Sequence, residues 1–338
     1  MAMAAAPPPR IYIYTGGRAP AFVPFAIVDP CTTAISAFAF ERNYCLLDAR
    51  LHNFVSRVEE HAFALCSSIT QMWMMGVKIV DYSAFYACIG LFRVEFGTDL
   101  ETIGESAFDQ CTSLRYIKMP SVIRIGSRAF QDCAFTELDL PKELEVVEEC
   151  AFAGCPSLVR VSMPLKEGMI QRGVFLSCDR LSRIDLVGDI HDVVSSLHLE
   201  AWRNDMTNEI DRINRVLPLI PDTQDKTTVI QEWMQSVLNR IEHYKGEHYE
   251  ILKEIMTIVE LALWSAKLLE AEKDRDEKLI TAISASTKNS SSSLEEDLSE
   301  KLKIDNEWNF RQEQRVACCA GIVIRNVIPF LGRMKFDS

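Results

Sequence analysis

The sequence predicts an α/β repeat solenoid of about seven coils of 22–23 residues, followed by an all-α helical hairpin. Three observations support this fold class. A phenylalanine returns at nearly constant spacing through the first half of the chain, and two further columns of residues keep register with it. After residue 230, apolar residues recur at helical spacing instead. Repetition at a fixed period is the signature of stacked structural units.

Three columns of residues define the repeat. The phenylalanine column steps by 23, 22, 23, 22, 22 and 23 residues, through Phe40, Phe63, Phe85, Phe108, Phe130, Phe152 and Phe175. Five residues before these lie Ile35, Val58, Val80, Ile103, Ile125, Val147 and Ile170. Three residues after them lie Asn43, Cys66, Cys88, Cys111, Cys133, Cys155 and Cys178. Because one coil of this length cannot bury its own apolar face, the columns predict a core that stacked coils share.

Each coil also carries the pattern of a short strand. Examples are Leu114-x-x-Ile117-x-Met119 and Leu158-x-x-Val161-x-Met163, in which alternate residues are apolar. The fourth copy is one residue short between Cys133 and Leu138. The L-x-x-L-x-L pattern with a period of 20–29 residues is typical of leucine-rich repeats. We therefore expect one strand per coil, with alternate strand residues buried.

Segments such as IGESAFDQCTSLRYIKMP resemble the BspA-like class of leucine-rich repeats, over about residues 25–190. The resemblance implies a right-handed solenoid with one short parallel strand per coil. The first copy departs from the pattern with Asn43 in the cysteine column, where asparagine is the commoner residue in other leucine-rich repeats. The later stretches ELALWSAKL and IVIRNVIPFL are similar to tails that follow such repeats in uncharacterised algal proteins, which implies an architecture and no chemistry.

The six cysteines of the repeat column are expected to form a buried ladder of free thiols, because free cysteine buries readily. Stacked coils would bring neighbouring members close enough for disulfide bonds, so bridges stay an alternative. No C-x-x-C pair is present, so the sequence predicts no structural zinc site.

The tail carries a heptad-like seam. Its members are Ile230, Met234, Val237, Ile241, Tyr244, His248, Ile251, Ile255, Ile258, Ala262, Ser265 and Leu269. The pair Thr228 and Gln231 fits a capping box at the start of this helix. A serine-rich break at 289–293 precedes a second predicted helix, whose capping box is Ser293 and Glu296. The simplest arrangement is a helical hairpin, and dimerisation through the seam is the alternative.

These patterns divide the chain into an N-terminal segment (1–24), a repeat solenoid (25–194) and a long-helix tail (195–338) with a linker near 287–293. The net charge of −12 argues against a nucleic-acid surface, which needs a clustered basic face. No signal peptide is evident, and the apolar run 316–331 is broken by Arg325 and Pro329. The sequence therefore predicts an intracellular, cytoplasmic protein without a membrane span.

No catalytic pattern is present. The chain lacks a phosphate-binding glycine loop and a G-x-S-x-G nucleophile elbow. His243 and His248 are five residues apart, about 140° around a helix, so they do not share a metal. We expect no enzyme activity, no cofactor and no metal site. An enzyme with a site between the repeats and the tail is the least favoured alternative.

The residues between the buried strand positions point outward, toward the concave face of a leucine-rich-repeat solenoid. We call them the strand-face strip: Asp48, Arg50, Gln71, Trp73, Arg93, Glu95, Tyr116, Lys118, Glu137, Asp139, Arg160, Ser162, Arg183 and Asp185. Arginine, tyrosine and tryptophan are the side chains that most often dominate binding energy at interfaces. The candidate partner-binding residues are Arg50, Trp73, Arg93, Glu95, Tyr116, Lys118, Glu137, Asp139, Arg160 and Arg183.

The leading hypothesis is a scaffold that binds a protein partner on this strip. It predicts that Trp73→Ala or Arg160→Glu abolishes binding and leaves the fold intact. The alternative hypothesis is a structural protein whose helical tail drives self-assembly. It predicts that deletion of 225–338 removes assembly and that changes in the strip are silent.

Overall fold

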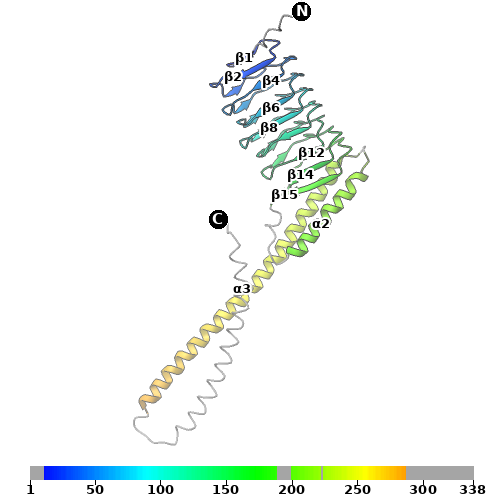
Figure 1. Ribbon diagram of the computed structural model, residues 1–338. Coiled ribbons are helices and arrows are strands. Elements are labelled where there is room, and N and C mark those ends of the chain that lie inside the picture. Colours follow the sequence, from blue (N-terminus) through cyan, green and yellow to red (C-terminus); the bar gives the residue numbers. More distant parts are fainter. Residues whose placement is uncertain (1–10, 189–198, 222–223, 287–338) are drawn as a thin grey trace, which may run out of the picture. The chain divides into compact units, whose positions relative to one another are not determined.

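The computed structural model describes residues 11–188, 199–221 and 224–286. Its described residues divide into two compact units, one made of 11–188 with 199–242 and the other of 243–286. In the first unit, successive coils stack in chain order from blue to green (Figure 1). The predicted repeat solenoid with a helical region after it is therefore confirmed.

The longer strands of the solenoid are parallel and form three consecutive three-stranded sheets, β1-β2-β4, β6-β8-β10 and β12-β14-β15. Their bounds are β1 (Ile11–Tyr14), β2 (Phe25–Val28), β4 (Asp48–Arg50), β6 (Gln71–Met74), β8 (Arg93–Phe96), β10 (Tyr116–Lys118), β12 (Glu137–Asp139), β14 (Arg160–Pro164) and β15 (Arg183–Val187). Adjacent strands pair in register, so Gln71 lies opposite Arg93, and Arg93 lies opposite Tyr116. Equivalent residues of successive coils therefore form straight columns across each sheet.

A second sheet of two-residue strands lies on another side of the coils, in the order β13-β11-β9-β7-β5-β3. These strands are β3 (Ala34–Ile35), β5 (Arg57–Val58), β7 (Ile79–Val80), β9 (Thr102–Ile103), β11 (Arg124–Ile125) and β13 (Val146–Val147). The last residue of each belongs to the isoleucine and valine column of the sequence, and all are buried. This sheet is an addition to the single strand per coil that the sequence predicted.

The phenylalanine column forms a buried aromatic spine. All seven rings are at most 2% exposed. Neighbouring ring centroids lie 4.9–6.2 Å apart, with interplanar angles of 2–12°. Tyr14 extends the spine by one ring, 5.1 Å from Phe40, and its hydroxyl accepts a hydrogen bond from the Ser36 amide. The strand repeat imposes the close parallel stacking, because it sets the distance between coils.

The cysteine column is a ladder of hydrogen bonds. The Sγ of each column cysteine lies 3.0–3.4 Å from the carbonyl oxygen of the phenylalanine one coil earlier, to which the thiol donates. In the first coil, Asn43 replaces the cysteine, and its Nδ2 donates a hydrogen bond to the Val23 carbonyl. Burial raises the pKa of Cys66 to about 12, so that thiol stays protonated and able to donate. The nine described cysteines are all free, so within the described residues the predicted free ladder holds.

The sheet of longer strands is interrupted twice. β10 and β12 are not paired at the copy that is one residue short, where the Ala134 amide donates to the Leu114 carbonyl instead. The missing residue shifts the chain before β12 and prevents a regular ladder. β4 and β6 are also unpaired, although the step from Phe40 to Phe63 is a regular 23 residues. The repeat spacing therefore did not predict this second interruption.

Two helices complete the last coil. α2 (Leu199–Val216) continues into the short 3-10 helix η1 (Leu217–Leu219), and α3 (Lys226–Ser286) follows. The Thr227 hydroxyl accepts from the Phe175 amide at 2.8 Å, and Lys226 Nζ donates to the carbonyls of Asp179 and Leu181. The Asn214 side chain both accepts from and donates to the backbone of Ile184. These side chains take the place of the next coil, which would otherwise satisfy the backbone groups.

The predicted capping box at the start of the long helix is wrong. α3 begins at Lys226, and Asp225 caps it by accepting a hydrogen bond from the Thr227 amide at 2.8 Å. Gln231 donates to the Ile170 carbonyl of the solenoid rather than back to Thr228. The helix therefore starts earlier than the motif indicated, because its first turn is tied to the last coil.

The predicted seam is buried at the start of α3, where Ile230, Met234, Val237 and Ile241 belong to the core of the first unit, as does Trp202 of α2. In the second unit, most seam residues are half-buried and Ile258 and Ser265 are exposed. The second arm of the predicted hairpin, after Ser293, lies outside the described residues. The sequence-based boundary at residue 195 stays a prediction.

Candidate functional site

The strand-face strip consists of outward side chains in two columns that cross the longer strands. Seven of the ten candidate residues are exposed, namely Arg50, Trp73, Tyr116, Lys118, Glu137, Asp139 and Arg183, and Gln71 of the strip is exposed as well. Arg93, Glu95 and Arg160 are half-buried, and Ser162 is buried, contrary to the expectation that it points outward. Trp73 is 46% exposed and Tyr116 is 41% exposed.

The middle sheet holds an ion pair between the two exposed rings. The Arg93 guanidinium lies 2.5 Å from Oε1 of Glu95, and its Cζ lies 4.3 Å from the centroid of Tyr116. Trp73 lies opposite Glu95, and Glu95 lies opposite Lys118. The ion pair and the cation–π contact fix Arg93 over one face of the Tyr116 ring, and the Tyr116 and Trp73 rings both remain partly exposed.

Arg160 is the centre of a second cluster on β12, β14 and β15. Its guanidinium lies 2.5 Å from Asp185, 3.0 Å from Asp139 and 3.6 Å from Glu137. The hydrogen bond with Asp185 raises the pKa of Arg160. Burial acts to raise the pKa of Asp185, but hydrogen bonds from Arg160 and Arg183 outweigh it and lower that pKa.

This cluster changes how an Arg160 variant is interpreted. Arg160→Glu would place a fourth carboxylate among three others, and like charges at such distances destabilise a fold. A loss of binding in that variant would therefore follow from damage to the sheet as readily as from loss of a contact. Within the part of the chain that the structure describes, no ion pair or ring contact holds Trp73, so Trp73→Ala tests binding at the strip more directly.

Lys118 differs from the other cations of the strip. Arg50 pairs with Asp48 at 3.0 Å, and Arg93, Arg160 and Arg183 each have a carboxylate within 3.1 Å. Among the described residues, no carboxylate lies within ion-pairing distance of the Lys118 ammonium group. The positive charge of Lys118 is therefore available to a ligand.

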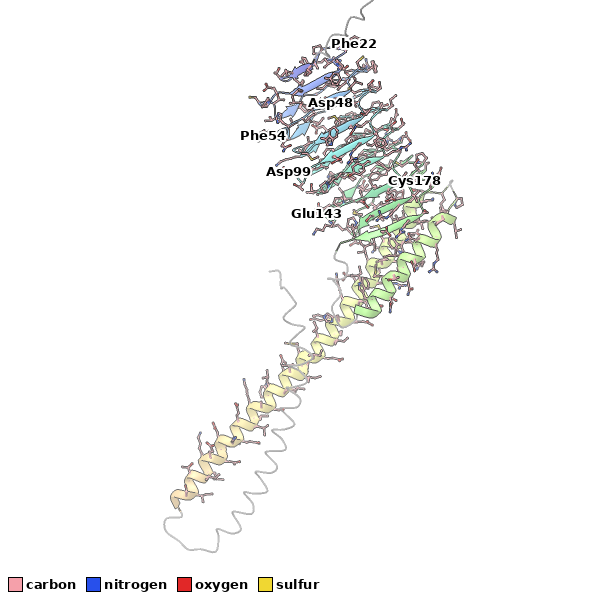
Figure 2. All side chains as sticks on the ribbon, viewed as in Figure 1. Phe22, Asp48, Phe54, Asp99, Glu143 and Cys178 are labelled. Carbon is pink, nitrogen blue, oxygen red and sulfur yellow. The ribbon has the colours of Figure 1, made fainter. Side chains whose placement is uncertain are left out.

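A cavity of about 530 Å³ opens on the strip where β4 and β6 are unpaired. Its lining residues are Leu47, Asp48, Ala49, Arg50, Leu51, Thr70, Gln71 and Trp73. Asp48, labelled in Figure 2, marks the β4 side of the opening. Sequence reasoning placed Arg50 and Trp73 on the strip but missed Leu47, Leu51 and Thr70, because only the broken pairing brings them to the surface together.

A smaller cavity of about 360 Å³ lies over the turns that follow β8 and its neighbours. Lys78, Asp99, Glu101 and Glu143 supply its charges, and Asp99 and Glu143 are labelled in Figure 2. The described part of the chain contains no group of three or more histidine, cysteine, aspartate or glutamate side chains placed to hold a metal ion. None of the helices in that part combines the length and the apolar character that crossing a membrane requires.

Comparison with known proteins gives a family match over the solenoid. The family described as "BspA type Leucine rich repeat region" matches residues 28–111 and 78–200, with six copies. No curated protein matches the chain.

Solved structures of leucine-rich-repeat proteins are also similar. One from T. pallidum is 23% identical, with a TM-score of 0.36, and the match covers 46% of this chain and 76% of that one. One from Bacteroides ovatus is 17% identical, with a TM-score of 0.32, and covers 48% and 54%. A leucine rich cell surface protein from Faecalibacterium prausnitzii is 18% identical, with a TM-score of 0.32, and covers 48% and 59%. The chain thus spans little more than half of the last two proteins.

Proposed function

The chain belongs to the BspA-type leucine-rich-repeat family, and from that premise we propose that it is a non-enzymatic scaffold that binds a protein partner on the strand-face strip. A repeat solenoid offers a broad rigid surface, and family members of this fold commonly act through such surfaces. The intracellular location expected from the sequence stays a prediction.

The observation that supports binding at the strip is the exposure of Trp73. A tryptophan side chain at 46% exposure on a paired strand keeps a large apolar area in water, which is unfavourable unless a partner covers it. Its neighbours supply hydrogen-bonding and charged groups around that area. An aromatic anchor surrounded by polar groups is the usual composition of an interface hot spot.

The test is a comparative pull-down from a native lysate with the wild-type chain and Trp73→Ala. Tyr82→Ala is the matched control, because Tyr82 has nearly the same exposure, 47%, and lies outside the strip after β7. We expect a set of proteins that the wild type and Tyr82→Ala retain and Trp73→Ala loses, at equal thermal stability. Identical sets for all three chains would contradict binding at the strip.

A second candidate function is self-assembly through the tail. In the second unit, α3 exposes Ile258, Leu261, Trp264 and Leu268, which are spaced by three or four residues and therefore share one side of the helix. A second copy of the same helix would cover this stripe. The two functions are compatible, since they use different parts of the chain.

A further inference from the structure

The charges of the strand-face strip are separated along the solenoid. Toward β10, Lys118 carries a positive charge that no carboxylate of the described residues neutralises at ion-pairing distance. Beyond the next interruption, the β12-β14-β15 cluster combines Glu137, Asp139 and Asp185 with only Arg160 and Arg183. Glu137 and Asp139 keep 66% and 76% of their side chains exposed. The strip therefore presents a positive site next to a negative one.

A cavity with an apolar wall precedes both of these. At the β4–β6 interruption, Trp73 lies on one side and Leu47 and Leu51 on the other, and the rest of the lining is Ala49 with the polar residues Asp48, Arg50, Thr70 and Gln71. Asp48 and Arg50 pair with each other, so they add no net charge. The cavity volume of about 530 Å³ exceeds that of any single amino-acid side chain, and the cavity opens on the same face as Lys118. Going along the solenoid, the strip offers an exposed aromatic ring at β6, a positive charge at β10 and negative charges at β12.

We propose that the strip binds an extended peptide segment of its partner that crosses the strands, with an apolar side chain in the cavity, an acidic side chain at Lys118 and a basic side chain at Glu137 and Asp139. This inference rests on the proposed function and specifies the chemistry of the partner. The deciding feature is order, since the acidic residue lies between the apolar and the basic one. One apolar site and two sites of opposite charge, met in this order along the solenoid, favour that order of side chains over its permutations.

The strand spacing sets the distances in the partner. β6 and β10 are two strands apart, which corresponds to about 10 Å at about 4.8 Å per strand. An extended chain covers that distance in about three residues. β12 follows by one further coil, so the basic residue comes one or two residues after the acidic one. The partner motif is therefore apolar, then acidic two to four residues away, then basic.

The test compares two fluorescent peptides of about twelve residues with identical composition. One carries a leucine, a glutamate and a lysine in the proposed order and spacing, and the other exchanges the glutamate and the lysine. Binding to the full chain is measured by fluorescence anisotropy at low salt, where exposed charge pairs contribute most. We expect the wild type to prefer the first peptide on the order of 10-fold.

Two variants assign the preference to its sites. Lys118→Gln and Asp139→Asn are each expected to reduce the preference to less than about 3-fold, because each removes one of the two charges that distinguish the peptides. Lys142→Gln is the matched control, since Lys142 is exposed and lies outside the strip. It should keep the wild-type preference, with all variants checked for equal melting temperature.

Equal binding of the two peptides, an undiminished preference in Lys118→Gln, or no binding of either peptide at about 1 mM would overturn the inference. The lysate experiment separates this failure from that of the proposed function. If the peptide test fails but proteins are still captured through Trp73, binding at the strip stands and only the proposed order of charges is wrong. If capture does not depend on Trp73, both proposals are wrong.

Discussion

The hydrogen-bond partners of single side chains in this solenoid come from the neighbouring coils. The column cysteines show this most clearly, because each thiol donates to a carbonyl one coil away. Asp109 departs from this pattern. It is 9% exposed, its Oδ1 accepts no hydrogen bond from the described residues, and Asp132 is its acidic neighbour. Burial, reinforced by Asp132, raises the pKa of Asp109 to about 6.

Acidification is therefore expected to stabilise the fold through Asp109. A carboxyl with a higher pKa in the folded chain than in the unfolded chain binds its proton more tightly when folded. Its ionisation destabilises the fold at neutral pH, and that loss is recovered as the pH falls from about 7 toward 4. The contribution is on the order of 1–2 kcal/mol, since one pKa unit corresponds to about 1.4 kcal/mol and the carboxyl keeps some contact with water.

Melting temperatures across that pH range test this expectation with two variants. Asp109→Asn should melt higher than the wild type at pH 7.5 and lose part of the rise on acidification. Asp99→Asn is the control, because Asp99 is an exposed aspartate in a turn. If Asp109→Asn followed the wild-type pH profile, Asp109 would not be the group responsible.

At the scale of elements, the end of the solenoid needs replacement partners for its backbone. The start of α3 supplies them through Lys226, Thr227 and Gln231, which bond to the last coils. The second sheet and the two interruptions of the first sheet belong to this scale as well. They depend on the hydrogen bonds between neighbouring coils. Only the interruption between β10 and β12 coincides with a change in the repeat spacing of the sequence.

Thr227→Val is expected to lower the free energy of unfolding by about 1–3 kcal/mol, because it leaves the buried Phe175 amide without an acceptor. Urea unfolding of the full chain measures this. Thr257→Val makes the same change at an exposed site of the same helix, where the hydroxyl bonds only to the Lys253 carbonyl. The control should change stability by less than about 0.5 kcal/mol. Equal effects in both variants would argue against the role of Thr227 in capping.

At the scale of the whole molecule, the exposed stripe of α3 predicts self-association of the chain. Sedimentation of the full chain should show a concentration-dependent dimer that Trp264→Ser weakens, since Trp264 is 69% exposed in the middle of the α3 stripe. Leu263→Ser is the matched control, because Leu263 is 58% exposed and lies outside the stripe, about 100° around the helix from Trp264. A monomer at all concentrations, or equal effects of the two variants, would remove self-assembly as a candidate function.

The sequence by itself determined the repeat architecture and the helical region after it. Three columns at a period of 22–23 residues leave few alternatives to stacked coils, because only stacking buries all of them together. The sequence also predicted that the strip residues share one face, since alternate strand residues point to opposite sides. Ser162 is buried, so this prediction did not hold for every member.

Only the tertiary structure decided which strip residues form ion pairs with one another and which keep their charged groups accessible to a ligand. Arg160 is held by three carboxylates from two neighbouring strands. No carboxylate of the described residues forms an ion pair with Lys118, although Glu95 lies opposite it and pairs with Arg93 instead. The cavity at β4 and β6 and the solenoid cap on α3 were equally beyond the sequence. Repeat spacing specifies which residues share a column. Ion pairs, hydrogen bonds and the strand pairing that is absent between β4 and β6 depend instead on distances between neighbouring coils.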